Sequence, residues 1–197
     1  MDLEDHLHEY LKVRRSNLLA KLDGLSEHDA RRPMTPRGTN LAGIVKHVAG
    51  VEVGYFGEVF GRPFPRPLPW FDDDDAEPDA DFWLPEDQTV ADVVELHHAY
   101  AAHSDATIEA LPLDAPGIVP WWEPERREVT LGRVLVHVLA ETARHAGHAD
   151  IVRELIDGAA GMGPGDVNLT RRTPQEWAAH RARIEAAARA STRGGER

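Results

Sequence analysis

Apolar side chains recur at intervals of three and four residues along most of the chain, and this spacing predicts amphipathic helices. Thr89 is a suitable N-cap for one of them, and Gly24 a suitable stop for another. No segment alternates apolar and polar residues convincingly enough to predict a strand. We therefore expect an all-α fold. The predicted helices span residues 2–22, 41–61, 90–113, 131–156 and 174–191.

The connections between these helices indicate one main domain. A chain of 197 residues is long enough for a single well-buried core. We expect residues 1–160 to form a helical bundle and residues 161–197 to form a C-terminal extension whose one helix packs on that bundle. Residues 62–87 are rich in proline and acid, yet they carry aromatic side chains that a disordered linker seldom contains. We expect an ordered loop laid over the bundle, and its aromatic residues are Trp70, Phe71, Phe82 and Trp83.

Composition excludes several classes of function. The 22 Lys and Arg residues face 34 Asp and Glu residues, and the net charge of -12 argues against nucleic acid and anionic membranes as partners. No basic segment precedes an apolar run at the N-terminus, and no stretch of about 18 apolar residues occurs, so we expect a cytoplasmic protein. The chain has no cysteine. A metal ion would therefore need His, Asp or Glu ligands, and a thiol in the reaction would come from outside.

The predicted helix 131–156 carries a stripe of candidate metal ligands, His137, Glu141, His145 and His148. Residues four apart lie about one turn apart on the same face. A rise of about 1.5 Å per residue separates His137 from His145 by about 12 Å, so the two cannot share one ion. The ion could be held by His137 and Glu141, by Glu141 and His145, or by His145 and His148. His47, near the centre of the second helix, is the candidate third ligand.

Other polar and aromatic residues could have either a binding role or a structural role. Trp121, Trp122, Arg126 and Arg127 precede the histidine-bearing helix and could line a pocket that binds an anionic substrate. Alternatively, the tryptophans close the end of the bundle while the arginines pair with surface acids. We assign His97, with its neighbours His98 and His103, to surface or interface positions, with His97 a candidate for the mouth of a pocket.

Two segments, TPRGTNLAGIVKHVAGVE (35–52) and VLVHVLAETARHAGHADIVRELIDG (134–158), resemble the DinB/YfiT-like superfamily, in particular its actinobacterial branch of mycothiol-dependent enzymes. The resemblance implies a four-helix bundle that holds a divalent metal. It also implies that His47, Glu141 and His145 are the ligands, as in the similar mycothiol-dependent maleylpyruvate isomerases, although many members have His at the position of Glu141. His137 and His148 would then orient a ligand or transfer a proton.

The function implied by this resemblance is transfer or isomerisation of a small electrophilic substrate with mycothiol, or a similar small thiol, as co-substrate. Two His and one Glu favour Zn²⁺, with Ni²⁺ or Fe²⁺ as alternatives, and leave one coordination position for a thiol or water. The resemblance also favours a homodimer. Two other functions stay open from the residues alone, namely a metal-dependent hydrolase and a non-catalytic metal-binding dimeric bundle.

Overall fold

The structure is a computed structural model that describes residues 2–68, 70, 76–163 and 166–192. It divides the chain into two compact units, Met1–Gly163 and Pro164–Arg197, and each unit is considered by itself. Most of the described residues are helical, which confirms the predicted all-α class. In the part that the structure describes, no helix is both long enough and apolar enough to cross a membrane.

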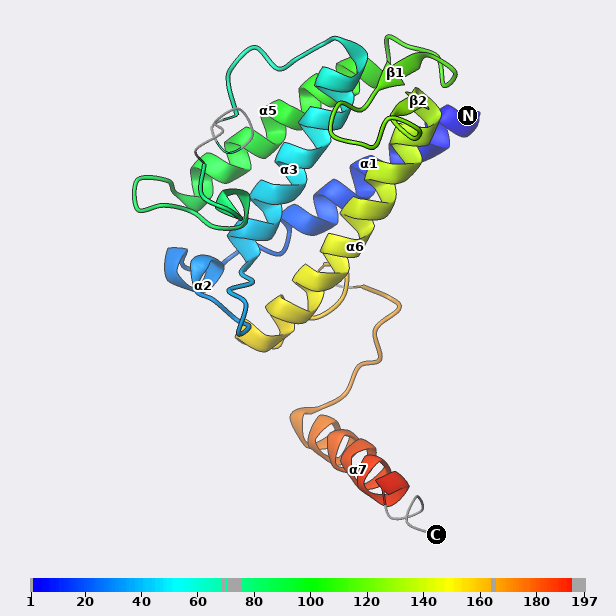
Figure 1. Ribbon diagram of the computed structural model, residues 1–197. Coiled ribbons are helices and arrows are strands. Elements are labelled where there is room, and N and C mark those ends of the chain that lie inside the picture. Colours follow the sequence, from blue (N-terminus) through cyan, green and yellow to red (C-terminus); the bar gives the residue numbers. More distant parts are fainter. Residues whose placement is uncertain (1, 69, 71–75, 164–165, 193–197) are drawn as a thin grey trace. The chain divides into compact units, whose positions relative to one another are not determined.

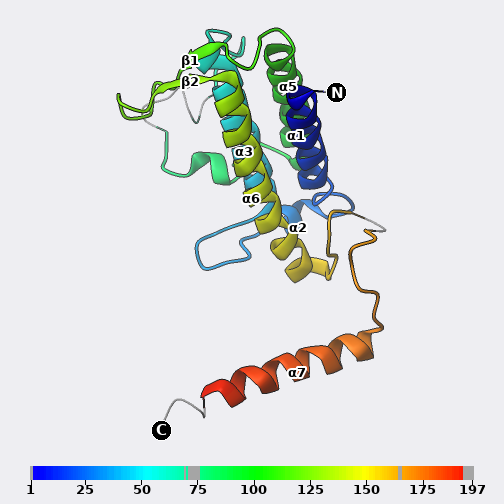
Figure 2. The same cartoon turned by 90° about the vertical axis from the view of Figure 1, so that its right-hand side faces the viewer.

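The four longest helices in the described part of the first unit pack together, and they confirm the predicted four-helix bundle (Figures 1 and 2). Helix α3 lies against both α5 and α6, and α1 lies against α6. Apolar side chains from these helices meet in two main clusters, one around Phe56 and Leu135 and the other around Leu41 and Ile44. The four helices are α1 (Leu3–Leu19), α3 (Leu41–Gly57), α5 (Val90–Ile108) and α6 (Leu131–Asp157).

Side-chain caps set where α3 and α6 begin. Asn40 accepts a hydrogen bond from the backbone N–H of Gly43 at 2.8 Å, and Thr130 accepts one from Arg133 at 3.4 Å. Each cap satisfies a donor that has no partner within the first helical turn. Helix α6 ends at Gly158, whose φ of +79° is left-handed and favours glycine. These groups therefore define where α3 and α6 begin and where α6 ends.

A short hairpin follows α5, so the prediction that the fold has no strand is wrong. Strand β1 (Pro116–Ile118) pairs antiparallel with β2 (Glu128–Thr130). Three residues are too few to show an alternating pattern, which explains why periodicity did not reveal them. Gly117 lies so close to the side chains of Val59 and Phe60 that a Cβ there would meet them at 2.8 to 2.9 Å. The structure also adds α2 (Glu27–Arg31), η1 (Glu58–Phe60) and η2 (Ala80–Phe82).

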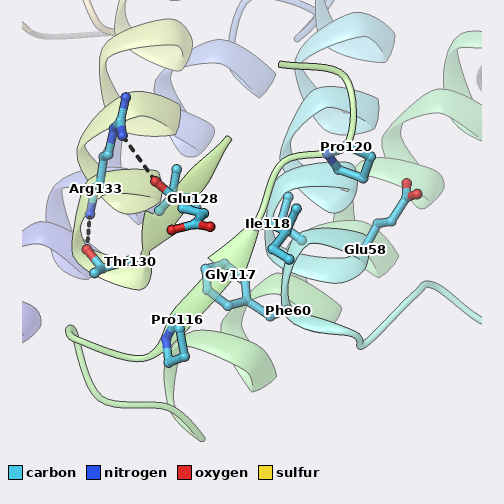
Figure 3. A pocket seen from close by; sticks show the side chains of 11 residues that line it. Glu58, Phe60, Pro116, Gly117, Ile118, Pro120, Glu128, Thr130 and Arg133 are labelled. Atoms are coloured by element: carbon cyan, nitrogen blue, oxygen red, sulfur yellow. Dashed lines mark hydrogen bonds between the residues drawn. The ribbon is translucent and has the colours of Figure 1, made fainter. Parts of the chain in front are cut away.

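A pocket of about 1000 Å³ lies where this hairpin meets η1 and the start of α6 (Figure 3). Its walls are mainly apolar, with Glu58, Glu128 and Arg133 as charged groups. The Arg133 guanidinium donates to the backbone carbonyl of Glu128 at 3.3 Å and lies over the ring of Trp122. The remaining lining residues are Val59, Phe60, Pro116, Gly117, Ile118, Pro120, Val129 and Thr130.

The described part of segment 62–87 is an ordered loop that packs on the bundle, as predicted. Leu68 is buried, and Phe64 and Trp70 pack beside it against Val53 and Tyr100. Residues 69 and 71–75, including the aromatic residue Phe71 of this segment, lie outside the described residues.

A buried network of charged groups connects α1, α3 and α5. Arg15 donates to Glu52 at 2.7 Å and to Asp105 at 2.6 Å, and His8 contacts the same Asp105 oxygen at 2.7 Å. Arg15 is 4% exposed and Glu52 is 1% exposed. Burial raises the pKa of Glu52, although the charge of Arg15 opposes this shift. Arg15 is therefore the cation that offsets the cost of burying the Glu52 carboxyl group.

His97 on α5 is 2% exposed, so its assignment to the surface, an interface or a pocket mouth is wrong. Its environment comes from residues distant in sequence, which helical spacing does not reveal. Burial, with smaller contributions from the charges of Arg15 and His98, lowers the pKa of His97 to about 4. The ring is therefore neutral in the folded protein at neutral pH.

The buried His97 predicts an acid-dependent loss of stability. Between the unfolded pKa of 6.5 and the folded pKa of about 4, the unfolded chain binds more protons, so stability falls as pH falls. At 1.36 kcal/mol per pKa unit, this group costs about 3 kcal/mol over that range. Urea unfolding between about pH 4 and pH 7 should therefore show a shallower pH slope for His97→Leu than for wild type. His98→Leu, at an exposed neighbour, serves as the control, and an unchanged slope in His97→Leu would contradict the expectation.

The second unit contains α7 (Pro174–Thr192). Thr173 accepts a hydrogen bond from the backbone of Glu176 at 3.3 Å, and the Glu176 carboxylate accepts one from the Thr173 N–H at 2.7 Å. This capping box and Pro174 at the first helical position agree with the predicted start of the helix. The packing of this helix on the bundle stays a prediction.

Candidate metal centre

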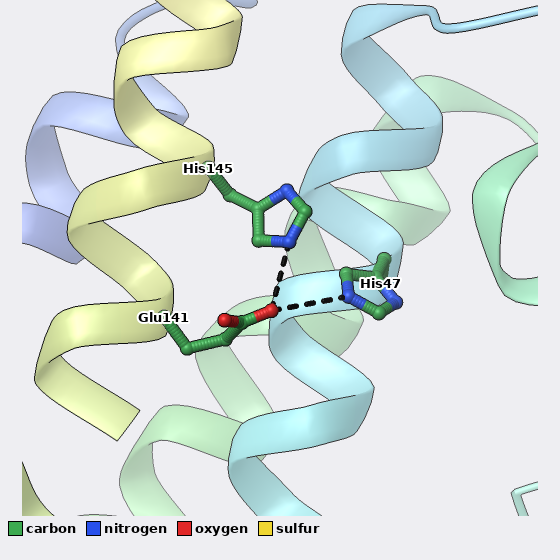
Figure 4. A group of neighbouring side chains, drawn as sticks. All are labelled: His47, Glu141 and His145. Carbon is green, nitrogen blue, oxygen red and sulfur yellow. Dashed lines mark hydrogen bonds and ion pairs between the residues drawn. The ribbon is translucent and has the colours of Figure 1, made fainter. Parts of the chain in front are cut away.

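His47, Glu141 and His145 lie together between α3 and α6 (Figure 4). Their nearest nitrogen and oxygen atoms all lie within 4.8 Å of one another. Glu141 Oε1 is 2.9 Å from His145 Nε2 and 3.9 Å from His47 Nε2. One turn of α6 separates Glu141 from His145, and the packing of α3 against α6 brings His47 to them. The structure thus assembles the three residues that the resemblance indicates as ligands.

The distances from Glu141 to the two imidazoles are compatible with one small divalent ion. Tetrahedral ligands about 2.1 Å from a common ion lie about 3.4 Å apart. The distances of 2.9 Å and 3.9 Å from Glu141 to the two imidazoles lie on either side of that value. Two imidazoles and one carboxylate are also the donor set of many catalytic zinc sites, in which one position stays open.

Burial favours the neutral form of His145, the form that binds metals. His145 is 8% exposed, and burial followed by the charge of His47 lowers its pKa, while Glu141 opposes this shift. A metal ligand must present a free ring lone pair, so a lowered pKa reduces competition from protons near neutrality. His145 Nδ1 is buried without a hydrogen-bond partner among the described residues.

Asp81, which the sequence did not single out, and Phe82, which it assigned only to the ordered loop, complete the surroundings of His47. Asp81 Oδ2 lies 2.6 Å from His47 Nδ1, and the Phe82 ring stacks on the imidazole with centroids 3.9 Å apart. Burial opposes ionisation of Asp81, but its hydrogen bond to His47 and the charge of that ring outweigh burial and lower its pKa. Asp81 lies in an acid-rich loop, and nothing in the local pattern separates it from its neighbours.

Lys46 and Gly43 of α3, together with its N-cap Asn40, hold the η2 segment that carries Asp81 against the helix. Lys46 Nζ donates to the backbone carbonyls of Ala80 and Trp83 at 2.8 and 2.9 Å. Asn40 Nδ2 donates to the carbonyl of Phe82 at 3.0 Å. Gly43 has no side chain, and a Cβ there would overlap the same carbonyl group. The loop is therefore held at a defined place over His47.

Gly43→Ala is expected to destabilise the protein, although alanine favours helices. The added methyl group must displace the Phe82 backbone, and overpacking of this kind costs about 1 to 3 kcal/mol. Gly54→Ala on the same helix is the matched control, because its Cβ would make an ordinary contact with Trp121 at 3.8 Å. Thermal unfolding should show a lower Tm for Gly43→Ala and no loss for Gly54→Ala. Equal Tm values would contradict the close packing of η2 on α3.

His137 lies one turn before Glu141, within an aromatic cluster. Its ring is 4.9 Å from that of Tyr55 and 5.2 Å from that of Trp122, centroid to centroid. Trp121 and Trp122 both donate their indole N–H to the Tyr55 hydroxyl, at 3.3 and 3.0 Å. Trp122 therefore contacts His137, one turn from Glu141, and Trp121 joins the cluster through Tyr55 of α3. Tyr55 was missed because its role depends on the fold of the hairpin loop.

The remaining predicted site residues, His148, Arg126 and Arg127, are exposed to solvent. His148 is exposed, and its ring centroid lies 5.2 Å from that of His145. Arg126 and Arg127 are exposed in the connection between β1 and β2. The pocket at the hairpin is lined by a different set of residues from the three candidate ligands. Roles for these side chains in catalysis or binding stay predictions.

A comparison with protein families matches residues 6–158 to the family described as Mycothiol-S-transferase. The match runs from within α1 to the glycine that ends α6, and it includes His47, Glu141 and His145. It agrees with the resemblance to the DinB/YfiT-like superfamily. No curated protein matches the chain.

Proposed function

The chain belongs to the mycothiol-S-transferase family, and from this premise we propose that it is a metal-dependent enzyme that transfers the mycothiol thiol to a small electrophilic substrate. Family membership supports the mycothiol-related transferase class. Metal dependence and the role of each side chain are the finer parts of the proposal.

The observation that carries the proposal is the convergence of His47, Glu141 and His145 within 4.8 Å. We propose that these three side chains hold the metal and leave one position open. Their nitrogen and oxygen donors suit Zn²⁺ best, with Ni²⁺ and Fe²⁺ as alternatives. When bound, such an ion supplies a Lewis acid that lowers the pKa of a thiol and keeps it as thiolate at neutral pH.

The charges of the ligands suit this use. Glu141 would supply one negative charge and the two neutral imidazoles none, so a divalent ion held by them would keep one net positive charge. One thiolate would neutralise that charge. Because the chain has no cysteine, the sulfur must come from the co-substrate.

We propose that two histidines transfer protons. His148, exposed beside His145, is placed to accept the proton that the thiol loses, and His137 is the second candidate. The thiolate sulfur then forms a bond with the electrophilic carbon of the substrate. The displaced electron pair leaves with the departing group, or stays on the substrate and takes up the proton from the histidine.

The aromatic cluster is proposed to contact the substrate. Trp122 and Tyr55 flank His137, one turn of α6 from Glu141, and half-exposed Trp121 extends this apolar surface. Arg126 and Arg127, at the end of the same connection, are proposed to meet a carboxylate on the thiol or substrate. The homodimer expected from the resemblance also stays a proposal.

The proposal is tested by conjugation of mycothiol to monobromobimane, measured with the zinc-loaded protein against protein-free and metal-free reactions. Product should form above background only when zinc, mycothiol and protein are all present. Equal consumption of the substrate without thiol would favour metal-assisted hydrolysis. Metal binding with neither thiol binding nor turnover would favour a non-catalytic bundle, and either result would contradict the proposal.

A further inference from the structure

A hydrogen bond connects the η2 segment to the candidate metal centre. Asp81 Oδ2 lies 2.6 Å from His47 Nδ1, and the side chains are 19% and 14% exposed, respectively. Asp81 is 34 positions from His47 in sequence, so only the fold of the loop brings it there. The bond is shielded on one side by the Phe82 ring, which stacks on the imidazole.

The arrangement decides which nitrogen of His47 is free. An ionised carboxylate can only accept a hydrogen bond, so His47 Nδ1 must carry the proton that it donates to Asp81. The other nitrogen, Nε2, then presents its lone pair when the ring is neutral. Nε2 is the atom that lies 3.9 Å from Glu141 Oε1, on the side of the candidate ligands.

We propose that Asp81 is a positioning residue that fixes the tautomer and orientation of His47, so that Nε2 is the ligand atom for a divalent metal. This inference rests on the proposed metal centre. A carboxylate behind a ligating imidazole also makes the ring a stronger electron donor, and loss of such a partner commonly weakens metal binding about 10- to 100-fold. Asp81 acts through His47 and does not itself touch the metal.

The attachment of η2 supports a positioning role. Lys46 and Asn40 donate to the backbone carbonyls on both sides of Asp81, and the missing side chain of Gly43 lets this backbone approach α3. Asp81 therefore meets His47 from a segment held at three further points. His145 differs, since its Nδ1 has no hydrogen-bond partner among the described residues.

The alternative is that the Asp81–His47 bond only fastens the loop to the bundle. A purely structural bond would change the stability of the protein and leave its affinity for metal unchanged. Zinc affinity and thermal stability measured on the same variants therefore separate the two roles.

The experiment compares wild type, Asp81→Ala, Asp81→Asn and Asp79→Asn by competition for Zn²⁺ with a chromophoric chelator. Asp81→Ala should weaken the zinc Kd about 10- to 100-fold. Asp81→Asn has nearly the same shape and can still accept a hydrogen bond, so its loss should be smaller. Asp79→Asn removes the same charge from an exposed position two residues away and should leave the Kd unchanged.

Two further measurements make the outcomes decisive. In zinc-loaded wild type, ¹H–¹⁵N NMR of the imidazoles should show the His47 proton on Nδ1; a proton on Nε2 would overturn the inference. A lower Tm of the metal-free Asp81 variants, with zinc Kd values equal to wild type, would also overturn it. His47→Ala distinguishes failure of the proposed metal centre from failure of the proposed role of Asp81. If His47→Ala also keeps full zinc affinity, the assignment of the metal centre is wrong. If His47→Ala loses zinc while the Asp81 variants keep it, only the role of Asp81 is contradicted.

Discussion

Glu141→Ala is expected to lower zinc affinity by at least about 100-fold. Loss of a residue that only hydrogen-bonds a metal ligand weakens metal binding about 10- to 100-fold, and Glu141 is proposed to bind the metal directly. The variant would leave His47 and His145 as two neutral donors, without the negative charge that offsets the ion. Elemental analysis after dialysis should show about one zinc per chain in wild type and little in the variant. Mycothiol-dependent turnover should fall with the metal content.

Two variants of the same helix control this result. Glu154→Ala removes an equal charge from an exposed position on α6 and should keep its zinc. Glu141→His keeps a ligand at the same place and should retain zinc better than Glu141→Ala does. Full zinc content in Glu141→Ala would contradict the assignment of this carboxylate as a ligand.

Arg15→Ala is expected to lower the free energy of unfolding by about 3 to 5 kcal/mol, the usual cost of leaving a buried charge unpaired. Arg15 donates to both Glu52 and Asp105, and Glu52 is almost fully buried. Without Arg15, Glu52 must either bind a proton or become exposed to water, and both changes destabilise the folded protein. Urea unfolding at neutral pH measures the loss.

An exposed ion pair on the same helices provides the comparison. Lys12 and Glu109 are 4.0 Å apart with side chains 44% and 66% exposed, and pairs of this kind contribute less than about 1 kcal/mol. Lys12→Ala should therefore change stability little. Combining Arg15→Met with Glu52→Leu should recover part of the loss, because apolar replacement of both partners removes the unpaired charge. Equal losses in Arg15→Ala and Lys12→Ala would contradict the role of the buried network.

The main helices, and the shared face of two of the three candidate ligands, were predictable because their signals are local. Helical periodicity indicates α1, α3, α5 and α6, and residues such as Asn40 and Gly158 mark helix ends by their own chemistry. Glu141 and His145 share a face because they are four residues apart. Local spacing does not identify His47 as the third ligand. Only the packing of α3 against α6, or the family resemblance, indicates it.

The parts that sequence did not predict depend on contacts between distant residues. The η2 segment brings Asp81 to His47 through an irregular loop that has no periodicity. His97 is buried because α5 turns that side towards the core, although His98 beside it is exposed. The hairpin has strands of three residues, too short for a pattern. In each case the deciding information is the tertiary environment.

The central claim is that His47, Glu141 and His145 hold one metal ion whose open position binds the sulfur of mycothiol. The most direct measurement is the absorption spectrum of the cobalt-substituted protein during titration with mycothiol, because a cobalt–sulfur bond produces a charge-transfer band in the near ultraviolet. We predict that this band appears and saturates at one thiol per cobalt in wild type. A cobalt spectrum that mycothiol leaves unchanged would contradict the claim.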